Sequence, residues 1–450
     1  MLAAGPATNG SYVGNTLTDN QSNSILLFAP NFRTPYSVQI NAGIQRELHH
    51  GTVLTVDYIR NRGLHYLVYY DTNHVGDARY LNTAAALSAI NATNKAFGCP
   101  AGSSGIDCAI AAGATISSYA GNGLDSGAAV NGGFPGCNCA FPGINPNVGQ
   151  NYMLQPIGKS IYNGMDVSLK QELTNPLPKV KRANLQFSYS LSRFNSMSFD
   201  QDFGGALADW NNYNHYIGPN ALDRTDQFSA GGVFEFPKGL RVNFITHAYT
   251  SLPVTLYLPP GPQREASSAQ IFQSDVTGDG TTGDVLPGTN VGSFGRSVTP
   301  GNMNQYISAY NSAYASKPTP AGMALVNAGL FTSSQLVQLG AVAPTLANAP
   351  AGQVGVGSLF TADLGFAWVF RLRESLTIQP SLTFFNLTNS QNFDIGNNIM
   401  SGTLQAAGAV SPGFANSTTY GQRTTKITLG SGVYSLGAPR QLEWGLKVTF

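Results

Sequence analysis

The clearest feature of the chain is a strict alternation of apolar and polar residues along extended segments. In the first of them, residues Tyr36, Val38, Ile40, Ala42 and Ile44 alternate with Ser37, Gln39, Asn41, Gly43 and Gln45. Successive side chains of a β-strand point to opposite faces, so this pattern predicts a strand with one apolar and one polar face. Similar segments recur down to the last residue, including 185–191, 227–236, 240–244, 360–370, 376–384 and 441–450. The chain is therefore expected to be all-β, with about nine antiparallel strands.

The charges within these segments favour a membrane wall over a soluble sandwich. A charged side chain that faces lipid at the bilayer midplane costs about 2 to 4 kcal/mol for Arg or Lys, so a bilayer keeps charges on the other face. The mid-strand charges all share the polar parity: Asp57, Asp166, Lys170, Glu235, Arg241, Asp363, Glu443 and Lys447. Arg46, Arg60 and Arg193 have the apolar parity and are expected at strand ends, where long side chains reach the headgroups.

The lengths of the predicted strands and the positions of the aromatic residues also favour a membrane wall. Strands of roughly 10 to 12 residues match the 9 to 11 that cross a bilayer at a tilt. Aromatic residues gather towards strand ends, as interfacial girdles do, at Tyr36, Tyr58, Phe236, Phe370 and Phe450. The predicted fold is an antiparallel transmembrane β-barrel.

The connections between the strands alternate between short and long. Short turns are expected at 49–51, 174–182, 237–239 and 371–374, and long extracellular loops at about 71–159, 194–225, 252–357 and 389–439. Residues 1–35 are interpreted as an incoming extracellular loop and 36–450 as a C-terminal barrel segment. Because single-chain bacterial barrels use an even number of strands, nine strands predict an incomplete barrel whose other strands and plug precede this segment.

Composition agrees with a membrane protein that crosses by strands. Charged residues make up 10% of the 450 residues, against about 25% in soluble domains. No stretch reaches the roughly 18 apolar residues of a membrane-spanning helix. A net charge of +1 gives no reason to expect nucleic acid as a partner. The opening MLAAGPATNGSYVGN lacks a secretory signal, so either the protein stays in the cytoplasm or the true N-terminus lies upstream.

Four stretches of the sequence carry a family resemblance. They are PYSVQINAGIQREL with VDYIRNRGLHYL; YNGMDVSLKQEL with LQFSYSLSRFN; LDRTDQFSAGGVFEFPKG; and SLTFFNLTNSQNF with the terminal RQLEWGLKVTF. These stretches resemble the TonB-dependent receptor barrels of the Oar-like kind. The final residues are also similar to the signal that the barrel-assembly machinery reads, at Leu442, Trp444, Leu446, Val448 and Phe450.

The resemblance implies ligand capture and TonB-coupled uptake in the bacterial outer membrane. Its partners would be outer-membrane lipid, the barrel-assembly machinery, an unknown extracellular ligand, and the TonB complex through a plug that this chain lacks. No carboxypeptidase-regulatory-like domain, usual in that family, is present. Two alternatives stay open: a non-transporting outer-membrane adhesin or structural anchor, and a secreted soluble β-sandwich that binds carbohydrate.

No enzymatic site is expected. The chain contains no nucleophile elbow, phosphate loop or HExxH motif, and its six histidines form no metal or triad arrangement. By parity, His247 is expected to face the lumen as a hydrogen-bonded residue or, alternatively, to contact a ligand.

One loop segment has the start of a calcium-binding pattern. In DVTGDGTTGD, oxygen ligands occur at Asp275, Thr277 and Asp279, and Gly280 permits a sharp turn. The usual Glu at position twelve is replaced by Leu286, although Asp284 lies nearby as a substitute. The alternative is an Asp/Gly-rich turn without metal. No other cofactor is expected.

Two further loop features are predicted. Cys99, Cys108, Cys137 and Cys139 fall in one loop, where disulfides are favoured over free thiols or a zinc site because the spacing is not C-x-x-C and no His lies among them. Between residues 320 and 342 the apolar spacing predicts two short helices. Thr332 and Gln335 would form a capping box at the start of the second.

Overall fold

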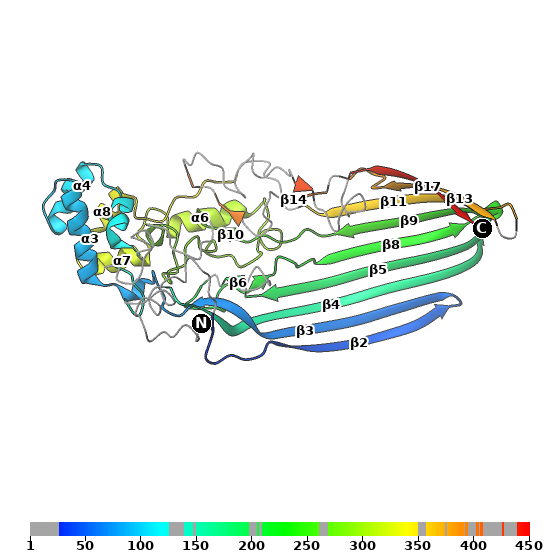
Figure 1. Ribbon diagram of the computed structural model, residues 1–450, viewed down its shortest axis with the longest axis horizontal. Helices are drawn as coiled ribbons and strands as arrows, with labels where there is room; N and C mark the ends of the chain where they lie inside the picture. Colours follow the sequence, from blue (N-terminus) through cyan, green and yellow to red (C-terminus); the bar gives the residue numbers. More distant parts are fainter. Residues whose placement is uncertain are drawn as a thin grey trace.

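Nine long strands form the body of the protein in a computed structural model (Figure 1). The structure describes residues 27–125, 139–146, 150–197, 205–206, 209–260, 269–349, 357–373, 376–390, 392–394, 402–404, 406–407, 425–426 and 439–450. The long strands are β2 (Tyr36–His49), β3 (Thr52–Asp71), β4 (Tyr152–Leu177), β5 (Val180–Ser196), β8 (Asp226–Glu235), β9 (Leu240–Tyr249), β11 (Leu359–Trp368), β13 (Thr377–Phe385) and β17 (Gln441–Thr449).

The long strands follow one another as an antiparallel meander. Each is hydrogen-bonded to the next long strand of the chain, in the order β2, β3, β4, β5, β8, β9, β11, β13 and β17. The predicted short turns join them at one end, and the turn between β8 and β9 is a 3₁₀ helix, η5 (Pro237–Gly239). Two-residue strands flank or lie outside this body: β1 (Leu27–Phe28), β6 (Gly205–Ala206), β7 (Gly218–Pro219), β10 (Leu256–Tyr257), β12 (Phe370–Arg371), β14 (Phe393–Asp394), β15 (Gly402–Thr403) and β16 (Thr425–Lys426).

Four strands are longer than the alternation predicted. Strand β4 has 26 residues and β3 has 20. Strand β4 begins at Tyr152, so the first long loop ends earlier than the expected residue 159. The β4–β5 turn is also tighter than the predicted 174–182, because the two strands continue to Leu177 and Val180. Register shifts in the β3–β4 pair at Tyr66 break the period-two pattern, which hid the extension.

The pairing register carries the two faces across the whole sheet. Residues directly opposite in an antiparallel pair point to the same face. Arg62 of β3 lies opposite both Val38 of β2 and Ile161 of β4, so all three side chains are on the apolar face. In the same way, Phe244, Leu364, Phe384 and Leu442 lie opposite one another on four successive strands and are on that face too.

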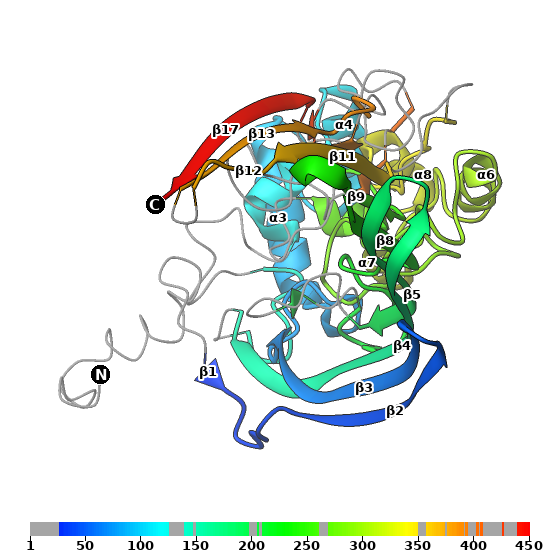
Figure 2. The same cartoon turned by 90° about the vertical axis from the view of Figure 1, so that its right-hand side faces the viewer.

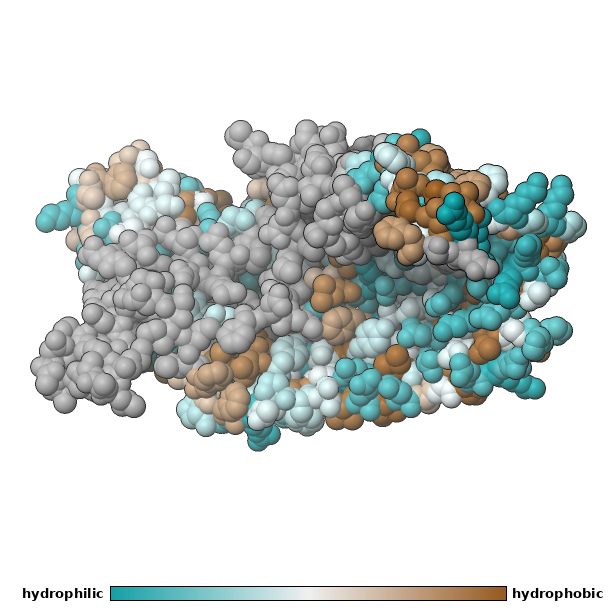
Figure 3. Space-filling model, turned by 45° about the vertical axis from the view of Figure 1, so that its right-hand side comes forward, coloured by the Kyte–Doolittle hydropathy of each residue, from teal (hydrophilic) through white to brown (hydrophobic). Residues whose placement is uncertain are grey.

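The opposite face lines a hollow. A cavity of about 550 Å³ is bordered by Lys170, Gln186, Ser188 and Asn243 of the polar parity, together with apolar residues such as Leu185, Val233 and Phe244. Viewed along the strands, the sheet is a curved wall (Figure 2). Hydrophilic residues are concentrated at the end that carries the short turns (Figure 3). The structure thus has the apolar outside and polar inside that the alternation predicted.

The curved sheet does not close on itself. Among the strands that the structure describes, β2 pairs only with β3 and β17 pairs only with β13. An open strand edge exposes unpaired N–H and C=O groups, which a closed barrel would satisfy. The fold is therefore an incomplete antiparallel β-barrel wall, as predicted.

Helices gather at the end of the sheet opposite the short turns (Figure 1). They are η2 (Ala78–Tyr80), α3 (Thr83–Ala96), η3 (Ser103–Gly105), α4 (Ile106–Ala111), α5 (Ile116–Tyr119), η4 (Ala120–Leu124), η6 (Gln270–Phe272), α6 (Met303–Ala313), α7 (Pro320–Asn327) and α8 (Ser333–Leu339). None of the helices in the described residues is long and apolar enough to cross a membrane. We call the described residues of 72–151 and 250–358 together the loop domain.

Candidate functional site

The loop domain has a hydrophobic core of its own. Ile90 and Ile106 from the first long connection pack in one buried cluster with Phe272 and Leu336 from the third. A second cluster, which includes Leu256, Phe294 and Ile307, lies within the third connection and also contains Leu404. Segments more than 150 residues apart in sequence thus form one folded unit at the long-loop end of the sheet.

The two predicted short helices of this unit are present. Helix α7 spans Pro320–Asn327 and α8 spans Ser333–Leu339. The capping box is present as well, because the Thr332 amide donates to Gln335 Oε1 at 2.9 Å and the Gln335 amide donates to Thr332 Oγ1 at 3.2 Å. Gln335 Nε2 also donates to Asp107 Oδ1 at 2.8 Å, which ties α8 to α4.

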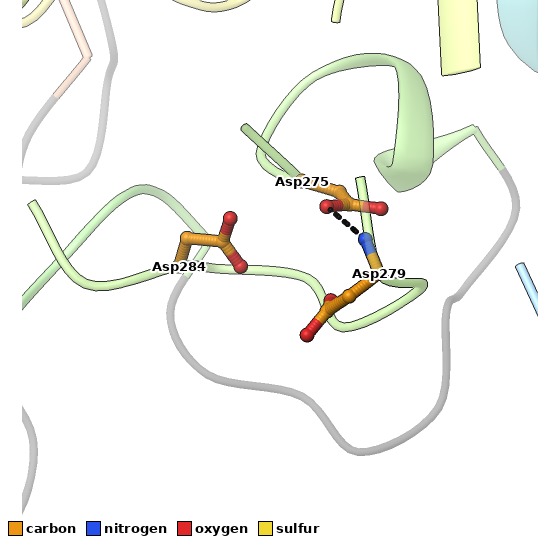
Figure 4. A group of neighbouring side chains, drawn as sticks. All are labelled: Asp275, Asp279 and Asp284. Carbon is orange, nitrogen blue, oxygen red and sulfur yellow. Dashed lines mark hydrogen bonds between the residues drawn. The ribbon is translucent and has the colours of Figure 1, made fainter. Parts of the chain in front are cut away.

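The predicted calcium loop brings three carboxylates together inside the loop domain. Oxygen atoms of Asp275, Asp279 and Asp284 lie within 4.8 Å of one another (Figure 4). Gly280 makes the predicted sharp turn, with φ of +91° and a Cβ position that would lie 2.4 Å from the Val75 carbonyl oxygen. Thr277 does not join the three carboxylates directly; its hydroxyl donates to Asp275 Oδ1 at 3.3 Å.

Backbone amides orient the three carboxylates. Asp275 Oδ1 accepts from the amides of Gly278 and Asp279, and its Oδ2 accepts from Gly280 at 3.0 Å. Asp284 Oδ2 accepts from the amides of residues 276 and 277 at 2.8 and 2.9 Å. Asp279 accepts from the Thr281 amide and hydroxyl and from the amide of Trp210, which belongs to a different connection.

Burial makes this concentration of negative charge unfavourable by itself. Asp275, Asp279 and Asp284 are 0%, 0% and 3% exposed. Burial, followed by repulsion from the neighbouring carboxylates, raises the pKa of Asp275 and of Asp284 well above the usual range. Burial also raises the pKa of Asp279, to about 6. No ion pair among the described residues involves any of the three.

Such a set of oxygen atoms has the chemistry of a hard divalent cation site. Calcium is bound by carboxylate and carbonyl oxygens, and a loop of this type supplies them from alternate positions. Leu286, at the position of the usual Glu, is fully buried in the second core cluster, so Asp284 is the last carboxylate of the loop. The geometry brings together three of the four predicted ligands.

The cysteines form at least one of the expected disulfides. Cys99 and Cys108 are bonded, with their Cα atoms 5.8 Å apart, and this bond links the end of α3 to α4. Cys139 is disulfide-bonded as well, whereas Cys137 lies outside the described residues. No free cysteine occurs in the described part of the chain.

The remaining predicted residues lie along the sheet. Leu442, Trp444, Leu446 and Val448 occupy the apolar face of β17, opposite Phe384, Leu382, Pro380 and Ile378. Phe450 follows the strand and is 93% exposed. His247 faces the hollow as a hydrogen-bonded residue, because its Nδ1 lies 2.8 Å from Ser229 Oγ and 3.0 Å from the Tyr249 hydroxyl.

Comparison with known protein families gives one match that spans nearly the whole chain. The model of the outer membrane beta barrel domain matches residues 2–442. The chain belongs to this family. The barrel wall therefore lies in the bacterial outer membrane, with its apolar face towards lipid. No curated protein was found to be similar in sequence.

Two solved outer-membrane proteins are similar in structure. The outer membrane transporter YddB from Escherichia coli aligns with a TM-score of 0.41 and 10% identity, over 94% of this chain and 34% of its own. A FadL homologue from Pseudomonas aeruginosa aligns with a TM-score of 0.18 and 10% identity, over 80% of this chain and 52% of its own. This barrel segment thus spans about a third of the length of YddB and about half of that of the FadL homologue.

The structure corrects two expectations about the barrel. Arg60 does not lie at a strand end but is the ninth residue of β3, with Arg62 on the same face. The alternative of a soluble sandwich is wrong, because the long strands form one curved sheet around a hollow and not two packed layers.

Sequence reasoning also missed most of the loop domain. Helix α3 was not predicted, although the alanine-rich segment after Asn82 carries a signal for it. Asn82 caps the helix by accepting from the Ala85 amide at 3.1 Å.

Proposed function

We propose that this barrel segment is the C-terminal part of a TonB-dependent, Oar-like receptor that captures an extracellular ligand and passes it through the barrel. The observation that carries the proposal is the loop domain, which is a folded unit with its own core at the long-loop end of the barrel wall. Receptors that hold a bulky ligand need such a preorganised surface, since ordering loose loops at the moment of binding lowers the affinity.

The open edges of the wall fit this function. Strands β2 and β17 present unpaired backbone groups, and an unpaired edge in lipid costs several kcal/mol for each unsatisfied group. We expect strands outside this chain to close the barrel and a plug to fill it, and the plug to contact the TonB complex. A non-transporting adhesin or anchor is the second candidate. It is favoured only by the loop domain, which would serve adhesion equally well.

Binding to TonB distinguishes the two. The full-length gene product, extracted from outer membranes in detergent, is expected to be retained by immobilised periplasmic domain of TonB. A version cut immediately before residue 1 of this chain is expected to flow through. Failure of the full-length protein to bind, while a known receptor binds on the same column, would leave the anchor as the better description.

We propose further that Asp275, Asp279 and Asp284 hold a calcium ion that stiffens the loop domain. A bound cation would offset the repulsion between these three buried carboxylates, which have no ion pair among the described residues. The Trp210 amide and the bridge between residues 77 and 279 connect this loop to two other segments, so a bound ion would stabilise the contacts between connections.

Calcium addition tests this proposal. Adding calcium to chelator-treated protein is expected to raise the melting temperature of the loop domain, and the Asp284→Asn substitution to remove most of that rise. The matched control is Asp223→Asn, a buried carboxylate of another connection that pairs with Arg296 at 2.8 Å. It is expected to lower stability and keep the calcium response. A melting temperature indifferent to calcium would support the metal-free turn.

A further inference from the structure

Four basic side chains interrupt the lipid-facing wall near its extracellular end. Arg60 and Arg62 of β3, Lys159 of β4 and Arg193 of β5 are all exposed. The register places Arg60 opposite Asn163 and Asn163 opposite Arg193, so these three residues form one row across three strands. Arg62 lies two residues after Arg60 on β3. Lys159 of β4 lies opposite Leu64, which is two residues after Arg62. We call these four residues the basic patch.

The basic patch has no acidic partner within the described chain. None of the ion pairs between described residues includes a member of it. Asp226 is the acid at the same end of this face, and its Oδ1 already accepts a hydrogen bond from the Tyr189 hydroxyl at 2.6 Å. Arg62 and Lys159 lie on adjacent strands, which are about 4.8 Å apart, whereas Arg60 and Arg193 are separated by β4 and are roughly 10 Å apart. At these separations the cations repel one another in a medium of low dielectric.

A small cavity adjoins the basic patch. It measures about 250 Å³ and is lined by Lys159 together with Arg33, His65 and Tyr213. The Nδ1 atom of His65 lies 2.9 Å from the carbonyl oxygen of Pro156, which leaves Nε2 available to a ligand. Two cations and a ring nitrogen around one opening have the donor chemistry of a phosphate site.

Apolar residues lie directly below these cations. On the same face of β3, Leu54, Val56 and Tyr58 lie between the short turn and Arg60, and Met165 lies opposite Tyr58. Six residues of tilted strand, at about 3.3 Å each, place Tyr58 well into the apolar band, which is about 25 Å tall. The arginines thus lie where the hydrocarbon gives way to the headgroups of the outer leaflet.

We infer that the basic patch and the adjoining cavity bind the phosphates of a phosphorylated glycolipid in the outer leaflet. The cations hold the phosphate groups, and the apolar side chains below them contact the acyl chains of the same molecule. A lipid fits better than free phosphate, because the cations and the apolar wall form one continuous surface. The lipid would also remove the repulsion between the unpaired cations.

Lipid binding to the full-length protein tests the inference. The protein is purified in detergent, reconstituted into phosphatidylcholine nanodiscs with either diphosphorylated or dephosphorylated lipid A, and the bound lipid A is counted by native mass spectrometry. The variant changes Arg60, Arg62, Lys159 and Arg193 to Gln. The control changes four other cations, Lys170, Lys179, Lys181 and Lys447, to Gln, because these lie in the hollow or at the short-turn end.

We expect the variant to bind diphosphorylated lipid A at least tenfold more weakly than the control, because each cation near an anionic surface strengthens binding. Equal binding of the dephosphorylated lipid, or equal loss in the control, would overturn the inference. Complete displacement by inorganic phosphate would also overturn it, in favour of a free-phosphate site. Heat-modifiable electrophoretic mobility checks folding, and Arg62→Gln alone, expected to show a severalfold loss, replaces the fourfold variant if that variant misfolds.

Discussion

Asp77 is a buried carboxylate that organises the start of the loop domain. Its Oδ2 lies 2.6 Å from Arg79 Nη2 and 3.5 Å from His74 Nδ1, and its Oδ1 caps η2 by accepting from the Arg79 amide at 2.9 Å. Burial by itself raises the pKa of this carboxyl, but the nearby His74 ring and the hydrogen bonds from Arg79 outweigh burial and lower the pKa to about 2. The charged form is therefore the one that the fold stabilises.

The Asp77→Asn substitution is expected to lower the unfolding free energy of the loop domain by about 1 to 2 kcal/mol at pH 7, allowing for solvent screening. A carboxyl whose pKa is lower in the folded state than in the unfolded state stabilises the fold above the unfolded value. That stabilisation is lost as the pH falls from about 4 to about 2.

Denaturant titrations at several pH values measure the effect. The wild type is expected to lose stability through this acid window and the variant to lose less. Asp107→Asn is the control, because the amide oxygen of the new residue can still accept the hydrogen bond from Gln335. Identical acid profiles for wild type and the Asp77 variant would show that Asp77 does not contribute this charge effect.

Helix α8 shows how one element holds two connections together. Leu336 is fully buried in the cluster that both long connections share, whereas its neighbour Val337 is 48% exposed. The helix begins at the capping box of Thr332 and ends at Gly340, which has φ of +74°. Local sequence thus sets the limits of the helix, and its buried face connects distant parts of the chain.

Leu336→Ala is expected to destabilise the loop domain by about 2 to 5 kcal/mol, because it leaves a cavity in a shared core. Hydrogen exchange is expected to increase in α3 and α4 as well as in α8, since those helices pack on the same cluster. Val337→Ala should change stability by less than about 1 kcal/mol. Increased exchange confined to α8 would show that the two connections fold independently.

At the scale of the whole molecule, the sheet separates lipid from a wet interior. Val167 and Ser168 are neighbours in β4 that point to opposite faces, and both lie near the middle of the wall. An arginine that faces lipid at the midplane costs about 2 to 4 kcal/mol, whereas an arginine in the hollow remains hydrated.

Val167→Arg is therefore expected to reduce the amount of folded barrel in the outer membrane severalfold, and Ser168→Arg to leave it nearly unchanged. Gel mobility of heated and unheated samples measures the folded fraction. A lipid-restricted photolabel provides an independent check, and is expected to mark Val38, Phe187, Phe366 and Leu446. Labelling of Gln39, Ser188, Asp363 and Glu443 instead would reverse the assignment of the two faces.

The strand pattern of the wall could be predicted because alternation of apolar and polar side chains is a property of residues that are adjacent in sequence. Residues 36–45 and 441–449 alternate without interruption, and both proved to be strands with the predicted faces. The β3–β4 extension was missed where register shifts at Tyr66 interrupt the alternation. The position of Arg60 was missed for the same reason, because a strand whose end is misplaced also misplaces its charges.

The sequence by itself determined the all-β class, the sidedness of the wall and the candidate carboxylates, because strand periodicity and loop spacing are local properties. Only the tertiary structure decided that the long connections share a core, that Asp284 meets Asp275 and Asp279, and that Arg193 lies level with Arg60. The reason is physical: burial and register depend on contacts between segments far apart in the chain, and the order of residues within one segment does not specify them.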